Sequence, residues 1–273
     1  MSFVRELSPP QMQKLQSGEN AEKFSLLKAD VLAGKVFPAV RKNELHFYYK
    51  GGCLYRFAGG AFRRDPNYEK FGKDLLSLPP YEREKIGVER RFLRADGRVM
   101  ERQLLDALYC HTFDGSYGGD CVVLDIEVDL NGAVARGKKC DLVLLNRRKD
   151  ELVFVEGKVF SDGRVLVAQS FTPEVIAQVN AYTQAISEQR QTILEQYARH
   201  IEIINELFGC SYRPPRNIVE PSKLLVYETP KTPTRNAAYT IGEINTELGA
   251  NNVLWVVEGE RPALDEIYFA LTR

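Results

Sequence analysis

Two apolar runs joined by a short polar turn decide the fold of this chain: Lys139-Cys140-Asp141-Leu142-Val143-Leu144-Leu145 and Leu152-Val153-Phe154-Val155-Glu156-Gly157-Lys158-Val159. Their β-branched and large apolar residues are typical of buried strands. Side chains alternate between the faces of a strand, so Glu156 and Lys158 share a face with Leu152 and Phe154. Buried charges are costly unless they are paired or bind a metal. If Asp141 lies beside them on the neighbouring strand, two carboxylates and one lysine converge, as in a site for a divalent cation and a water molecule.

The surrounding sequence predicts a mixed α/β fold. A third strand-like run at about 121–129 precedes the other two, and the connecting turns are short, so the three strands should form an antiparallel meander. Residues 97–112 have helical spacing, with leucines on one stripe and Glu101 on the same face. A second helix should begin after Thr172 and Pro173 and continue, with an interruption, to about residue 208. Strands at 223–228 and 253–257 complete the predicted sheet.

We expect residues 1–85 to form a separate amino-terminal α+β region for substrate or partner recognition, and residues 86–273 to form the second domain. A helical or irregular opening leads to strands at 44–50 and 53–57, with Gly51-Gly52 as the turn of a β-hairpin. Pro79-Pro80 then marks a linker. The aromatic residues of the hairpin are open to two interpretations: they stack nucleic-acid bases beside Lys50 and Arg56, or they form the inside and outside of a small sheet.

Composition narrows the class of protein. The 273 residues are 44% hydrophobic and 27% charged, as in ordinary globular proteins, and no apolar stretch is long enough to span a membrane. The amino terminus lacks the layout of a signal peptide, so we expect a cytoplasmic protein without a membrane partner. Five scattered cysteines with no Cys-x-x-Cys pair argue against a disulfide framework or a structural zinc site.

Charge is balanced overall but clustered locally. Because its formal net charge is zero, the chain lacks the overall basicity of a passive nucleic-acid binder. Basic residues nevertheless gather before and after Asp141, and the largest group is Arg83, Lys85, Arg90, Arg91, Arg94, Arg98 and Arg102. These clusters are either solvated surface or contacts for phosphate groups.

The order helix, three-stranded meander, helix, strand resembles the PD-(D/E)xK nuclease superfamily, to which restriction endonucleases and RecB-type exonucleases belong. The resemblance covers roughly residues 90–230. Asp141 stands at the motif aspartate, although Cys140 replaces the usual preceding proline, and Glu156-Gly157-Lys158 matches the (D/E)-x-K triplet. Glu101 is placed like the acidic residue of the first core helix. Gln178-Val179-Asn180-Ala181-Tyr182 matches the Gln-x-x-x-Tyr motif of the RecB-like branch.

The resemblance implies a restriction-endonuclease-like core, with a mixed central sheet flanked by helices, and a Mg²⁺ cofactor for which Mn²⁺ could substitute. The carboxylates of Asp141 and Glu156 and the carbonyl of Gly157 would bind the ion. Lys158 would orient the attacking water and stabilise developing charge. Glu101 would bind a second ion or hold a metal-bound water.

Gln178 and Tyr182 would position the nucleic-acid backbone or brace the lysine. Every candidate site residue named so far also has a purely structural alternative. Asp141 could accept backbone hydrogen bonds at a strand end, and the Glu-x-Lys could be a surface ion pair. Glu101 could stabilise a helix dipole, while Gln178 could be a solvated amide and Tyr182 a packed aromatic.

The first strand of the meander carries three acidic residues with alternating spacing. Asp125, Glu127 and Asp129 should share one face, along a solvated edge of the sheet. Glu127 is the reserve candidate for a metal ligand if Glu101 does not take that role.

The function expected from these observations is a Mg²⁺-dependent nuclease acting on DNA in restriction, repair, recombination or defence. Two alternatives stay open: a catalytically silent nucleic-acid-binding or scaffold module with the same fold, and an RNA-cleaving relative. The expected partner is nucleic acid, with the chain acting as a homodimer or within a larger nucleic-acid-processing complex.

Overall fold

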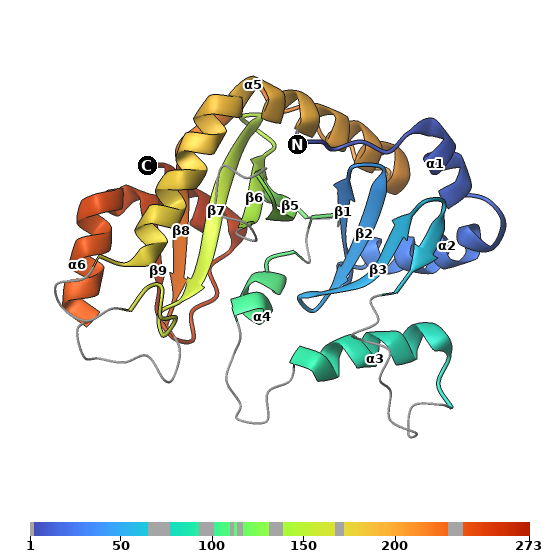
Figure 1. Cartoon of the computed structure of the whole chain (residues 1–273), viewed down its shortest axis with the longest axis horizontal. Coiled ribbons are helices and arrows are strands. Elements are labelled where there is room, and N and C mark those ends of the chain that lie inside the picture. Colours follow the sequence, from blue (N-terminus) through green and yellow to red (C-terminus); the bar gives the residue numbers. More distant parts are fainter. Residues whose placement is uncertain are drawn as a thin grey trace. The chain divides into compact units, whose positions relative to one another are not determined.

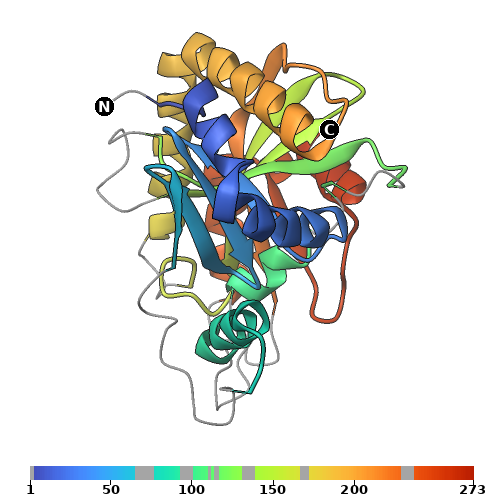
Figure 2. The same cartoon turned by 90° about the vertical axis from the view of Figure 1, so that its right-hand side faces the viewer.

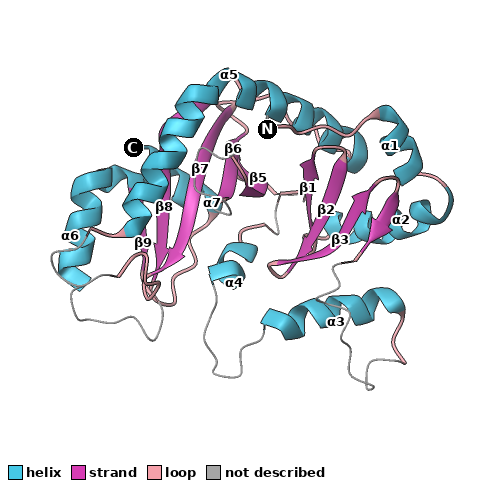
Figure 3. Ribbon diagram, viewed as in Figure 1, coloured by secondary structure: helices cyan, strands magenta, loops and turns pink. Residues whose placement is uncertain are grey.

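The computed structural model describes residues 3–64, 77–92, 101–109, 112–113, 117–130, 139–166, 172–228 and 237–273. This described part is mixed α/β, with two sheets and seven α-helices (Figures 1 and 3). The chain divides into two compact units. The first comprises Met1–Phe3, Gly118–Ala198 and Arg213–Arg273, and the second comprises Val4–Tyr117 and Arg199–Tyr212. We call them the mixed-sheet unit and the antiparallel-sheet unit. The domain boundary expected near residue 85 stays a prediction, because compact units need not coincide with functional domains.

The antiparallel-sheet unit contains the predicted helical opening and the hairpin. Its helices are α1 (Pro9–Leu15), α2 (Gly18–Leu32), α3 (Pro80–Phe92) and α4 (Glu101–Asp106). Its strands pair antiparallel in the order β1 (Phe37–Arg41), β2 (Glu44–Tyr49), β3 (Gly52–Ala58) and β4 (Ala61–Arg63). Helix α2 lies against this sheet (Figure 2). Phe24 of the helix packs on Phe47 of β2, with 6.5 Å between the ring centroids.

Two expectations for this unit need correction, and one open alternative is decided. Pro80 does not lie in a linker but begins α3, where its missing N–H costs nothing. The helix predicted over 97–112 is shorter in its described part: α4 ends at Asp106, and Leu108 and Tyr109 then form tight turns with N–H bonds to carbonyls three residues back. Tyr55 and Phe57 are fully buried, so the structural interpretation of these two hairpin aromatics is the correct one.

The mixed-sheet unit contains the predicted meander. Its strands are β5 (Cys121–Val128), β6 (Cys140–Asn146), β7 (Glu151–Val159), β8 (Asn217–Tyr227) and β9 (Val253–Val256), in that spatial order. Strands β5, β6 and β7 pair antiparallel, whereas β8 and β9 add in parallel. The meander and the two later strands are therefore confirmed. Strand β7 is central, which explains why both of its faces are apolar.

Helices cover this sheet and complete its core. Helix α5 (Glu174–Phe208) begins directly after Thr172 and Pro173, as predicted, and is interrupted at Gln189. Its buried valines and isoleucine pack with Leu224 and Val226 of β8, and α6 (Ala237–Leu248) joins the same apolar cluster. Helix α7 (Leu264–Thr272) contacts β5 and β9. None of the helices in the described ranges is long and apolar enough to cross a membrane.

Candidate active site

Asp141 and the Glu156-Gly157-Lys158 segment meet where β6 and β7 separate. The last residue pair of the two strands is Leu142 with Val155, so Asp141 and the triplet lie just beyond the ladder. There the Asp141 carboxylate accepts the Gly157 N–H at 2.9 Å, in place of a main-chain carbonyl. This bond is the backbone hydrogen bond that the structural alternative for Asp141 predicted, and it also ties the aspartate to the triplet.

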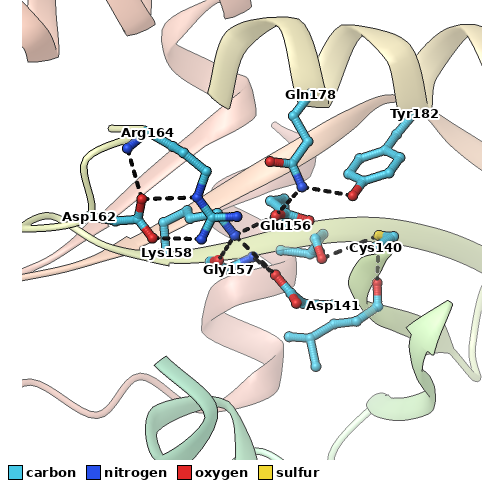
Figure 4. Close-up of polar contacts among 11 residues, drawn as sticks. Cys140, Asp141, Glu156, Gly157, Lys158, Asp162, Arg164, Gln178 and Tyr182 are labelled. Atoms are coloured by element: carbon cyan, nitrogen blue, oxygen red, sulfur yellow. Dashed lines mark hydrogen bonds and ion pairs between the residues drawn. The ribbon is translucent and has the colours of Figure 1, made fainter. Parts of the chain in front are cut away.

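Three oxygen atoms converge on the ammonium group of Lys158 (Figure 4). Nζ donates to the Gly157 carbonyl at 2.7 Å and to Oε1 of Glu156, and it lies 3.5 Å from Oδ2 of Asp141. Glu156 and Lys158 are each only 1% exposed, whereas the side chain of Asp141 is 15% exposed. The alternative of a surface ion pair is therefore wrong for Glu156 and Lys158.

Helix α5 braces the glutamate from above the sheet. Gln178 donates through Nε2 to Oε1 of Glu156 at 2.6 Å and to the hydroxyl oxygen of Tyr182 at 2.8 Å (Figure 4). Gln178 and Tyr182 are four residues apart on one face of the helix, and both are buried. Gln178 is therefore not a solvated amide, and Tyr182 is both packed and hydrogen-bonded.

Burial dominates the electrostatics of the site. It raises the pKa of Asp141 above the usual range, while the charge of Lys158 and the Gly157 N–H act in the opposite direction. Burial also raises the pKa of Tyr182 far above its usual value, so this side chain is a neutral phenol at physiological pH. The pKa of the Cys140 thiol is likewise raised by burial, and its Sγ donates to the carbonyls of Leu142 and Val155. Cys140 is therefore a neutral packing residue.

Glu101 begins α4, which belongs to the antiparallel-sheet unit, whereas the converging residues belong to the mixed-sheet unit. Its part in the site stays a prediction. Glu127, the reserve candidate, lies 3.6 Å from Lys139 as an ion pair, and its negative charge contributes to raising the pKa of Asp141. Glu127 is therefore electrostatically coupled to the site, and its part in metal binding also stays a prediction.

The solvated acidic face expected on β5 is wrong for Asp125. The strand is irregular here, with a register shift between Val123 and Asp125 and a positive φ at Glu127. Asp125 is fully buried, where it accepts the N–H of Ile126 at 2.8 Å and the hydroxyl of Tyr197 at 3.2 Å. Asp125 is a buried structural carboxylate and does not line a solvated edge.

The chemistry of the donor set fits a hard divalent cation. Mg²⁺ prefers carboxylate and carbonyl oxygens and keeps several waters, so it needs few protein ligands. Two carboxylates and one carbonyl already surround a single positive charge, the Lys158 ammonium. Among the residues that the structure describes, however, no three His, Cys, Asp or Glu side chains are grouped to hold a metal ion. A cation here would therefore depend on Asp141, Glu156 and the Gly157 carbonyl.

Sequence reasoning missed one pair beside the site. Asp162 and Arg164 lie in the turn after β7 and form an ion pair at 2.6 Å (Figure 4). The available signal was a turn of the form Asp-Gly-Arg directly behind the Glu-x-Lys strand.

Comparisons with protein-family models, curated proteins and solved structures found no match. The functional interpretation therefore depends on the geometry above.

Proposed function

We propose that this protein is a Mg²⁺-dependent nuclease that hydrolyses phosphodiester bonds of DNA on a restriction-endonuclease-like core, in restriction, repair, recombination or defence. The observation that carries the proposal is the convergence of three oxygens, from Asp141, Glu156 and Gly157, on one buried cationic group. The buried ion pair of Glu156 and Lys158 is expected to add little stability over apolar residues of the same size, so its presence favours a chemical role.

In this proposal the side chains divide the work. Asp141, Glu156 and the Gly157 carbonyl hold the divalent cation, with Mn²⁺ as a substitute for Mg²⁺. When bound, the cation polarises the phosphate and lowers the pKa of a water ligand. Lys158 orients the attacking water and stabilises the charge that develops on the phosphate oxygens. The water oxygen would bond to phosphorus and give up one proton to solvent, while the bond to the leaving oxygen would break and that oxygen would take up a proton from solvent.

The bracing residues hold the glutamate in place. Gln178 donates to Oε1 of Glu156 and is itself in contact with the Tyr182 hydroxyl, so the carboxylate keeps one orientation. A pre-oriented ligand avoids the loss of side-chain entropy when the cation binds. Glu101 remains the proposed ligand of a second ion or of a metal-bound water.

A second candidate function is a catalytically silent nucleic-acid-binding module. One observation favours it: the Lys158 ammonium already interacts with all three oxygens, as it would in a purely structural network. The two functions differ in metal dependence. Only the nuclease requires saturable Mn²⁺ binding that disappears when Asp141 is replaced by asparagine, which isothermal titration calorimetry measures directly.

The decisive experiment incubates labelled linear and circular DNA, single- and double-stranded, with the protein in Mg²⁺, Mn²⁺ or EDTA. We expect metal-dependent cleavage by the wild type and loss of cleavage in Glu156→Gln and Lys158→Met. Glu151→Gln is the matched control, since Glu151 is a carboxylate at the other end of the same strand, bonded to Tyr268. If wild type and Glu156→Gln behave alike, the proposal is wrong. Parallel RNA substrates test the RNA-cleaving alternative.

A further inference from the structure

The turn after β7 is held by both elements that carry the candidate active site. The Asp162 N–H donates to the Val159 carbonyl at 2.9 Å, which closes the turn onto the strand. The Arg164 carbonyl accepts the N–H of Val175, at the start of α5, at 3.0 Å. Val165 is fully buried in the apolar cluster with Phe160. The backbone of Arg164 is therefore fixed relative to β7 and α5.

The guanidinium of Arg164 is also fixed. Its Nε and Nη2 donate to the two carboxylate oxygens of Asp162 at 3.0 and 2.6 Å, and the Arg164 main-chain N–H donates to Oδ1 at 2.8 Å. Burial tends to raise the pKa of Asp162, but the hydrogen bonds and charge of Arg164 outweigh burial and lower it. The carboxylate is therefore ionised, and it orients a planar group suited to bidentate contact with oxyanions.

The Asp162–Arg164 pair lies beside the catalytic lysine. Figure 4 shows Asp162 and Arg164 next to Lys158, and the charge of Lys158 contributes to lowering the pKa of Asp162. The exposures of the two cations differ sharply: the Arg164 side chain is 41% exposed, whereas Lys158 is 1% exposed. Of these two described cations, Arg164 is the one that a polyanion approaching this end of β7 can reach from solvent.

We propose that Arg164 binds the nucleic-acid backbone, by contacting a phosphate next to the one that is cleaved. This inference depends on the proposed nuclease function and adds to it a substrate-binding residue. Asp162 accepts from Nε and Nη2 and so holds the plane of the guanidinium, a group whose geometry matches phosphate oxygens. Contacts with phosphate do not depend on base sequence, so Arg164 would set the position of the strand and not its sequence.

The test measures binding and cleavage separately. Wild type, Arg164→Ala and Arg164→Gln are titrated against a short fluorescein-labelled oligonucleotide of mixed sequence, in EDTA and over a range of salt concentrations, with anisotropy as the readout. We expect affinity to fall about tenfold in both variants, equally for different base sequences. The slope of log affinity against log salt should fall by about one, because one phosphate contact is lost. With Mg²⁺, KM should rise by a similar factor while kcat stays within about twofold.

Arg190→Ala is the matched control, because Arg190 is also a partly exposed arginine paired with a carboxylate, that of Glu220. Mn²⁺ affinity by calorimetry should be unchanged in every arginine variant. If wild type cleaves DNA and both Arg164 variants bind oligonucleotide as tightly as wild type and Arg190→Ala, the inference is overturned while the nuclease function stands. A wild type that neither binds nor cleaves nucleic acid overturns both. The Arg164→Gln variant keeps the size and polarity of the side chain, so a folding defect confined to Arg164→Ala leaves the test decisive.

Discussion

Replacing Lys158 by methionine should destabilise the mixed-sheet unit strongly. The methionine fills the space of the aliphatic stem but removes the charge on which Asp141, Glu156 and the Gly157 carbonyl converge. Glu156 is only 1% exposed, so water does not replace the lost partner. Removing one member of a buried ion pair typically costs about 3–5 kcal/mol, and we expect a loss of unfolding free energy in that range.

The loss should depend on pH, because part of it is relieved by protonation. Burial raises the pKa of Asp141, and the lysine charge opposes this shift. Without the lysine, the folded-state pKa rises further above its unfolded value. The stability that the Asp141 carboxyl contributes is then fully present below its pKa in the unfolded chain, and it is lost as pH rises through its pKa in the folded protein. The difference between wild type and Lys158→Met should therefore be smaller at mildly acidic pH than at alkaline pH.

Urea unfolding monitored by tryptophan fluorescence is the assay. Trp255 is the single tryptophan of the chain and lies on β9, 5.6 Å from the Phe160 ring between centroids, so it reports on the mixed-sheet unit. The double variant Glu156→Gln/Lys158→Met should recover much of the lost stability, since neither charge remains. Mn²⁺ should raise the midpoint of Lys158→Met more than that of wild type. An unchanged midpoint in Lys158→Met, or strict additivity in the double variant, would refute the reasoning.

Two further predictions concern the carboxylates of Asp125 and Asp106. Tyr197→Phe removes a hydroxyl donor to the fully buried Asp125 and should lower the unfolding free energy by about 1–3 kcal/mol in the same urea assay; equal stability would contradict the importance of this bond. Burial raises the pKa of Asp106 to about 6, against the opposing effects of the Gly51 N–H and Lys50. Stability from this group is present below its unfolded pKa and is lost as pH rises through about 6. Asp106→Asn keeps an oxygen acceptor for the Gly51 N–H. By calorimetry it should therefore melt at a higher temperature than wild type at neutral pH and at the same temperature near pH 4. A difference in melting temperature that does not change with pH would count against the raised pKa.

The sequence predicted the meander and the convergence because both follow from short-range rules. Short turns force neighbouring strands to pair antiparallel, and the two-residue period places Glu156 and Lys158 on one face. The same rules put Gln178 and Tyr182 on one face of α5. The bond from Asp141 to the Gly157 N–H follows in turn, since a strand that passes the end of its ladder needs another acceptor.

The parts of the structure that were not predicted depend on features that the periodic spacing of residues along strands and helices does not encode. The register shift between Val123 and Asp125 and the positive φ of Glu127 both interrupt β5, and Asp125 lies in the core and not at a solvated edge. The early end of α4 after Asp106 comes from tight turns that leucine spacing alone does not reveal. Arg164 was not predicted as part of the site because its position depends on hydrogen bonds with Asp162 and Val175, which join separate elements.

The cost of burying Glu156 and Lys158 is itself an argument about function. Apolar replacements of a buried ion pair are often as stable as the pair or more stable, because two charges must lose their hydration when they are buried. If Glu156→Leu/Lys158→Met unfolds at or above the wild-type midpoint, stability alone gives no reason for these two charges. The reason must then lie in what the charges bind, and the oxygens around Lys158 are of the kind that bind a divalent cation. A clear loss of stability in the same variant would instead favour the structural network of the silent module.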